Sequence, residues 1–420
     1  MFNTSATQIH LAENSINTVK RKNITLRYLF FTFLKIGCVS FGGHMALVSL
    51  VQKMMVDKDE TLDNEVMLDG ITIASLLPGP LAVNVVAYIG YHLKGKTGAF
   101  ISIVGVLLPA CTLMLVLSRI YFAFSYKIDW AHVMYYVGGT VSAIILSTGL
   151  QLYKKEISGN YKKGLLCIFT VVIVSLTNNY LITIGLIILG AFAGFLLGNN
   201  KYSSVSIANY FRPKGKFKIG PGAGLVILLF AVSEFLFLSA MFKNFNSLIL
   251  KIGVVFSGIS LSLFGGGYVM IPIMQSLFVN NLHWLSNQQF VDSIAFSQAT
   301  PGPILVSATF IGYKLAGVGG AILATVAMFA PSAILMVIVS RIFKKNKDHT
   351  LVKDMIAGVK AVVIGLIVSS AVKILFQQHL SVSIAVVAVA SFILCFKYKI
   401  SPVYLIIASI SIGTIANFLI

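Results

Sequence analysis

The sequence predicts an all-α polytopic membrane protein of about 13 transmembrane helices, built as two homologous inverted repeats whose helices are broken at matched positions. Three observations lead to this fold class. The chain is strongly apolar, its second half repeats motifs of its first half, and its basic residues gather in alternate loops between apolar runs.

Composition places the chain in a lipid bilayer. Hydrophobic residues make up 57% of the sequence and charged residues 11%, whereas soluble domains carry about 25% charged residues. The apolar runs 181–197, 222–242 and 321–340 are close to the ~17–25 residues that cross a bilayer as a helix. Long continuous runs favour helices over the alternating strands of a membrane barrel.

The net charge of +19 does not indicate a nucleic-acid-binding protein, because the lysines and arginines lie in short loops rather than on one soluble domain. The four cysteines are scattered and form no metal-binding or disulfide pattern. We therefore expect no metal, no cofactor and no nucleic-acid partner.

Taken in order, the chain begins with a polar segment, residues 1–24, which we expect to be a cytoplasmic tail. Residues 25–200 form the first repeat of about six spans, and its first apolar stretch, Leu26–Val56, is long and broken by two glycines. Residues 201–243 hold a basic linker and a single span that inverts the second repeat, residues 244–420.

Two motifs establish the repeat. A Phe-Gly-Gly and a Pro-Gly-Pro in the first half both recur 223 residues later, as the numbering of the pairs shows. Further matches follow at an offset of 222, including Pro109 with Pro331. The motif residues are Phe41, Gly42, Gly43, Pro78, Gly79, Pro80, Phe264, Gly265, Gly266, Pro301, Gly302 and Pro303.

Span parity predicts that the two repeats face opposite ways. The sequence leaves open whether the short runs 164–177 and 382–396 cross the membrane or form hairpins. Under either interpretation an odd number of spans separates the starts of the two repeats. The distribution of basic loops then places the N-terminus inside and the C-terminus outside.

Inverted repeats with helices broken at matched positions are typical of secondary transporters, whose sites lie near the bilayer midplane. Proline suits the first position of a helix, so Pro80 and Pro303 are expected to open half-helices with free backbone amides. Free amides and the positive end of the helix dipole form an anion site. The alternative is that both motifs only bend and pack helices.

Polar side chains near the Pro-Gly-Pro motifs are candidate ligands. Asn84 matches Ser307 in the repeat, and Ser75 matches Gln298. We expect Asn84 and Ser307 to contribute to substrate binding, and the alternative for each is a hydrogen bond between helices.

Charged residues inside apolar segments are few. Lys35 either neutralises an anionic substrate or pairs with a carboxylate. Glu234 is a candidate proton carrier or forms a static pair with Lys35 or Lys360, although Lys360 lies near a span end and is expected to extend to the interface. Asp69 and Asp292 lie at matched helix starts, where they act either as helix caps or as gates on opposite faces.

The doubled unit resembles the chromate transporter family of bacterial inner-membrane proteins. The resemblance rests on Phe-Gly-Gly, an aspartate nine residues before Pro-Gly-Pro, and Ile-Gly-Tyr after it, in both halves of the chain. It implies a two-domain carrier that exports chromate across the plasma membrane, with sulfate as a related substrate and a periplasmic C-terminus. One departure is His44, where the family often has proline after Phe-Gly-Gly.

Three other interpretations were compared with a chromate carrier. An enzyme is disfavoured because the sequence contains no HExxH, no GxSxG and no cluster of histidines and acids at ligand spacing. An anion channel, or a transporter of sulfate or another small anion, is compatible with broken helices. Coupling to protons and assembly as a homodimer are both compatible with the sequence.

Overall fold

The fold is taken from a computed structural model, which describes residues 24–41, 44–124, 134–177, 180–197, 247–262, 267–343, 350–376 and 381–419. Every regular element in these ranges is a helix. Several predicted features lie outside the described residues, namely the basic linker and single span, Glu234, Gly42, Gly43, Phe264, Gly265 and Gly266.

The first half contains α2 (Leu26–Val39), α3 (His44–Val51), the π-helix η1 (Gln52–Lys58), α4 (Asn64–Leu76), α5 (Leu81–Ala123), α7 (Val137–Glu156), α8 (Tyr161–Leu176) and α9 (Tyr180–Leu197). The second half contains α11 (Leu248–Leu261), η3 (Gly267–Val269), α12 (Met270–Met274), the π-helix η4 (Gln275–Asn281), α13 (Asn287–Ala299), η5 (Ile304–Val306), α14 (Ser307–Phe343), α15 (Thr350–Phe376), α16 (Val382–Phe396) and α17 (Pro402–Leu419).

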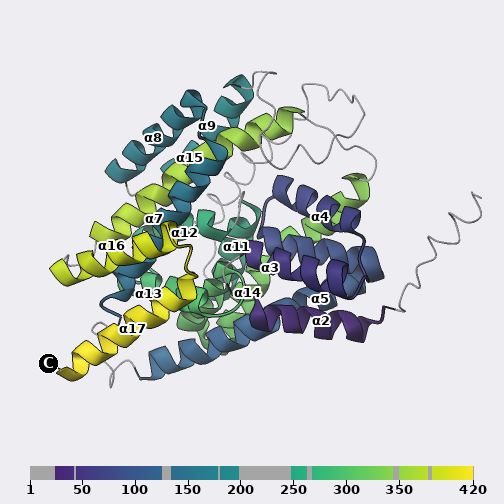
Figure 1. Cartoon of the computed structure of the whole chain (residues 1–420), viewed down its shortest axis with the longest axis horizontal. Helices are drawn as coiled ribbons and strands as arrows, with labels where there is room; N and C mark the ends of the chain where they lie inside the picture. The colour runs from purple at the N-terminus through teal and green to yellow at the C-terminus, as the bar shows by residue number, and fades with distance from the viewer. Residues whose placement is uncertain are drawn as a thin grey trace, which may run out of the picture.

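These helices form two groups (Figure 1). Helices α2, α3 and α4 lie together on one side, and α7, α8, α9, α15 and α16 lie on the other, with α11 and α14 between them. Helix α13 packs on α7 and α17. The two halves of the sequence pack on each other in two places, because α5 packs on α14 and α15 packs on α7, α8 and α9.

The two halves repeat the same local structure. The π-helices occupy matched positions, and each is followed by a non-glycine residue in the left-handed region, Glu60 (φ 50°) or His283 (φ 51°). Helices α2 and α11 bury the same stripe of residues at the 223-residue offset, which is produced by the i, i+4, i+7 spacing of an amphipathic helix. The matched pairs are Leu29 with Ile252, Phe33 with Phe256, and Ile36 with Ile259.

The first apolar stretch of each half folds back on itself. The Tyr28 hydroxyl, on α2, donates a hydrogen bond to Asp59 Oδ2 at 2.6 Å, just after η1. A continuous helix would separate these two residues by about 45 Å. In the second half, the rings of Phe256 on α11 and Phe278 on η4 lie 5.1 Å apart.

The Pro-Gly-Pro segments are also the tips of hairpins. A Cβ atom built on Gly70 of α4 would lie 2.7 Å from the ring of Tyr88 on α5, although a straight helix would place them about 27 Å apart. In the second half, the Lys314 ammonium on α14 donates a hydrogen bond to Gln289 Oε1 on α13, so the chain folds back there too. Helices α4 and α13 each have 13 residues, too few for the ~20-residue span of a bilayer.

These hairpins add a fold-back to the expected path of the chain in each half. The sequence pattern does not distinguish them, because apolar hairpin arms buried in protein have the composition of a crossing helix. The count of about 13 crossings stays a prediction. Among the described residues, three helices are long and apolar enough to cross: Leu81–Ala123, Ile304–Ser340 and Ala357–Phe376.

Two of these long helices contain a sharp turn at matched glycines, Gly95 (φ 63°) in α5 and Gly317 (φ 59°) in α14. The chain reverses there, because Gly90 packs against the carbonyl of Gly98, and a Cβ atom on Gly90 would lie 2.5 Å from that oxygen. The part of α5 beyond the turn is about 40 Å long. It is therefore long enough to cross a bilayer by itself.

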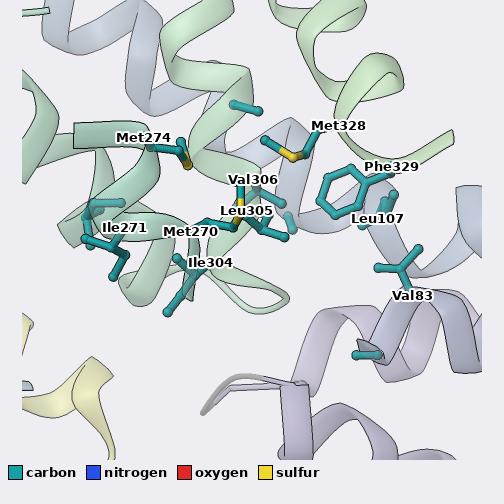
Figure 2. Packing of buried hydrophobic residues seen from close by; sticks show 14 of the residues in the cluster. Val83, Leu107, Met270, Ile271, Met274, Ile304, Leu305, Val306, Met328 and Phe329 are labelled. Carbon is teal, nitrogen blue, oxygen red and sulfur yellow. The ribbon is translucent and has the colours of Figure 1, made fainter. Parts of the chain in front are cut away.

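The two halves share one apolar core. Figure 2 shows Val83 and Leu107 of the first half together with Leu305, Met328 and Phe329 of the second half. All five belong to a single cluster of buried residues. The Pro-Gly-Pro tips are thus held where the two halves meet.

Candidate functional site

Each Pro-Gly-Pro tip packs against the long helix of the opposite half. A Cβ atom on Gly79 would lie 2.1 Å from Cβ of Ser332, and a Cβ atom on Gly302 would lie 2.9 Å from Cβ of Ala110. Ala110 and Ser332 are matched in the repeat, each directly after its helix proline. Both glycines have a positive φ, 116° and 119°. Only glycine provides both that backbone conformation and the close contact.

A small cavity lies between the two tips and is lined by residues of both halves. Its volume is about 10 Å³, which is the room that one water molecule needs. The lining residues are Pro80, Leu81, Ala82, Gly267, Tyr268, Pro303, Ile304 and Leu305. As the described residues lie, this space holds about one water molecule.

Two helix starts face this cavity without side-chain caps. Pro80 precedes α5 and Pro303 precedes η5, and neither start has a side chain bonded to its amides. The first amides of a helix have no partner within the helix. Pro80 and Pro303 are thus N-cap residues, one position before the predicted first position of a helix, and in the second half the three-residue η5 stands between Pro303 and α14.

Polar side chains beside the tips are buried and incompletely bonded. Asn84 is fully buried, and its Nδ2 donates to the Pro78 carbonyl at 3.2 Å. Among the described residues Asn84 Oδ1, Ser307 Oγ and both amide atoms of Gln298 have no hydrogen-bond partner. Such groups are costly to bury, typically by ~1–3 kcal/mol each. Ser75, the repeat partner of Gln298, is exposed, and its hydroxyl donates to the Thr72 carbonyl at 2.7 Å.

The Phe-Gly-Gly motif of the first half approaches the tip of the second half. The Gly302 amide donates a hydrogen bond to the Ser40 carbonyl at 2.9 Å, and Ser40 directly precedes Phe41. The Phe41 side chain itself is 44% exposed. The structure therefore brings together motifs from different halves, which the sequence pattern alone did not pair.

The two matched aspartates are not helix caps. Asp63 and Ser286 are the N-cap residues of α4 and α13, and each predicted aspartate lies one and a half turns further along its helix. Asp292 is fully buried and accepts hydrogen bonds from the Tyr121 hydroxyl at 2.7 Å and from Gln288 Nε2 at 2.8 Å.

The Asp292 contact joins the two halves, because Tyr121 lies near the C-terminal end of α5 in the first half. Tyr121 is held by the rings of Phe296 and Phe310 from the second half, at 5.8 and 5.2 Å. Its repeat partner is Phe343, which has no hydroxyl. The sequence analysis did not single out Tyr121, although this tyrosine–phenylalanine difference at a matched position was a usable signal.

The structure places two of the predicted lysines. Lys360 of α15 forms an ion pair at 3.0 Å with Glu156, the last residue of α7, whereas Glu234, its other predicted partner, lies outside the described residues. Lys35 is exposed and lines a separate groove with Arg27 and Lys58, away from the tips.

Crossing helices, doubled hairpins and a central closed gap define a polytopic membrane transporter of duplicated architecture. The family model for chromate transporters matches residues 27–195 and 250–414. The chain belongs to the chromate transporter family, which is a transporter family and not an enzyme family. The predicted resemblance is thereby confirmed.

Relatives agree with this assignment. The chain is 27% identical over 408 residues to a chromate transport protein of Cupriavidus metallidurans, covering 96% of each chain. It is 28% identical over 394 residues to an uncharacterized transporter of Methanocaldococcus jannaschii, covering 94% of this chain and 95% of the relative. An uncharacterized transporter of Bacillus subtilis matches 36% of this chain and 86% of its own length at 31% identity. No solved structure matches the chain.

Proposed function

We propose that the protein is a secondary transporter that exports a tetrahedral oxyanion, chromate in the first place, from the cytoplasm across the bacterial inner membrane. The substrate is expected to bind between the two Pro-Gly-Pro tips and to pass by alternating access. Membership of the chromate transporter family supports the substrate class, as does the name chromate transport protein of two relatives.

One observation carries the proposal: two uncapped helix starts from different halves face one gap, beside buried polar groups that have no hydrogen-bond partner among the described residues. Free amides and helix dipoles favour anions. The unbonded hydroxyl of Ser307 and amide group of Gln298 provide further donors. Once the tips separate, an oxyanion would satisfy groups that the closed conformation leaves unbonded.

Opposite orientation of the repeats is supported by contacts at the two ends of α5. The α4 hairpin packs on Tyr88 through Gly70, near the turn at Gly95. The matched hairpin of the second half meets α5 at Tyr121, through Asp292. The part of α5 between those ends is about 40 Å long, so we infer that the two hairpins enter from opposite faces.

In this arrangement the two Pro-Gly-Pro hairpins would act as gates. Asp69 and Asp292 would lie toward opposite faces of the membrane. Separation of one hairpin from the other half would open the transporter to one side, and separation of the other hairpin would open it to the opposite side. Glu234, in the single span, stays a candidate proton carrier if transport is coupled to protons.

The substrate proposal is tested by uptake into vesicles that contain the purified protein. Chromate uptake should saturate, and sulfate and molybdate should compete more strongly than phosphate, which is partly monoanionic at neutral pH. Asn84→Leu with Ser307→Ala should reduce uptake at least tenfold, because it removes ligands of ~1 kcal/mol or more each. The buried Ser118→Ala variant, whose hydroxyl bonds only within α5, is the control. Equal uptake by both variants, or conductance at channel rates, would contradict the proposal.

Orientation is tested by labelling with a membrane-impermeant thiol reagent. Cysteines introduced at Lys94 and Lys314, beside the turns of α5 and α14, should be labelled from opposite sides of the membrane. The background should lack the four native cysteines, Cys38, Cys111, Cys167 and Cys395. Labelling of both positions from the same side would reject the inverted arrangement.

A further inference from the structure

A basic groove lies between α2 and η1, apart from the gap at the tips. Its volume is about 390 Å³, within the range of ligand pockets, which starts near ~300 Å³. Arg27 and Lys35 of α2 and Lys58 of η1 line it, together with the polar side chains of Thr25, Thr32 and Asp59. We propose that this groove is a second anion site, which binds a tetrahedral oxyanion group carrying more than one oxygen acceptor.

The charges of the groove are available to a ligand. Arg27 and Lys35 are two turns apart on the exposed face of α2, and Lys58 is exposed on η1. Asp59, the one acid of the lining, already accepts the Tyr28 hydroxyl at 2.6 Å. Within the described ranges no ion pair neutralises any of the three basic groups. Lysine and arginine bind oxyanions through charge-assisted hydrogen bonds.

The groove is specific to the first half and is not required by the repeated fold. At the 223-residue offset, Arg27 corresponds to Leu250, Lys35 to Gly258 and Lys58 to Asn281. One lysine, Lys251, takes the position of Tyr28. Since the stripe that packs α2 is conserved in α11 while the basic residues are not, the charges serve something other than packing.

The position of the groove suggests its role. It lies at the end of the molecule where α2 begins and η1 ends, and three cations at one end raise the local concentration of anions there. If the proposed transport function holds, the groove gathers substrate at the face from which export starts. The same chemistry would also bind the phosphate of an anionic lipid headgroup, and the test separates the two sources.

The test measures binding rather than transport. Radiolabelled sulfate is titrated against the full-length purified protein in phosphatidylcholine vesicles at low ionic strength. Lys35→Gln with Lys58→Gln should weaken sulfate binding about tenfold, an effect that salt screens. The matched control, Lys94→Gln with Lys96→Gln, removes the same charge from the exposed α5 turn and should leave binding unchanged. The charge-conserving variant Lys35→Arg with Lys58→Arg should retain sulfate binding.

A second arm adds phosphatidylglycerol. If the groove holds lipid headgroups, phosphatidylglycerol should displace sulfate from the native protein. The variant Lys35→Gln with Lys58→Gln should then retain less of this lipid than the control Lys94→Gln with Lys96→Gln. Equal sulfate binding and equal lipid retention in both variants would overturn the proposal. Because the measurement requires no transport, a protein that binds sulfate in the groove but fails to carry chromate would count against the proposed function alone.

Discussion

Gly79→Ala should abolish chromate uptake and be the most damaging single change at the tips. The new Cβ atom would lie 2.1 Å from Cβ of Ser332 and 2.6 Å from its Oγ, while φ stays at 116°. A left-handed or more unusual backbone costs a non-glycine residue ~1–3 kcal/mol, and the clash with a buried helix adds to this. We expect a fall in the thermal midpoint in detergent and a loss of uptake of at least tenfold.

Two variants separate clash from backbone strain. Gly95→Ala also has a positive φ, 63°, but no atom lies within 4 Å of the new Cβ, so it should cost the backbone strain of ~1–3 kcal/mol alone. Ser332→Gly, combined with Gly79→Ala, removes the contacted atoms and should restore part of the stability. If Gly79→Ala costs no more than Gly95→Ala, the tip does not pack on the opposite half.

Asp292→Ala should have the second largest effect, on the contact between the halves. It leaves the buried Tyr121 hydroxyl and Gln288 amide without their partner and opens a cavity at a fully buried position. Loss of hydrogen bonds to a charged group costs ~1.5–3 kcal/mol each. Tyr121→Phe removes one of them, and should shift the population toward the state open at this end by about tenfold or more.

The shift is measured with a thiol reagent at Ser297→Cys, a position on α13 that is 1% exposed in the closed conformation, in a background without native cysteines. Tyr121→Phe should speed labelling there. Tyr313→Phe is the matched control, because Tyr313 stacks on Phe122 and the change removes a hydroxyl that bonds to no described residue. Unchanged labelling in Tyr121→Phe would show that this hydrogen bond does not hold the end closed.

Much of the architecture could be predicted from the sequence. The apolar runs required helices in lipid, and the doubled motifs at a constant offset identified the repeat, which the two segments of the family model agree with. The role of Pro80 and Pro303 as helix starts could also be predicted, because proline has a fixed φ and no amide hydrogen. These features depend on local chemistry, which the sequence states directly.

The path of each helix could not be predicted in this way. A 13-residue arm such as α4 and one half of a crossing helix have the same composition, and only contacts such as Gly70 with Tyr88 distinguish them. Likewise, Lys35 was predicted beside the substrate but lines the basic groove. The position of a residue along an apolar run indicates its depth in the membrane. The direction in which its side chain points depends on which helix packs beside it.

The sequence by itself therefore determined the membrane environment, the duplication and the paired Pro-Gly-Pro breaks, since composition and spacing are enough for each. Only the tertiary structure decided that the breaks are hairpin tips, that each tip packs on the other half, and that Asp292 meets Tyr121 rather than capping its helix. The physical reason is that these contacts join residues far apart in the sequence, such as Gly79 and Ser332, which are 253 positions apart. Their partners are chosen by packing, which no local pattern records.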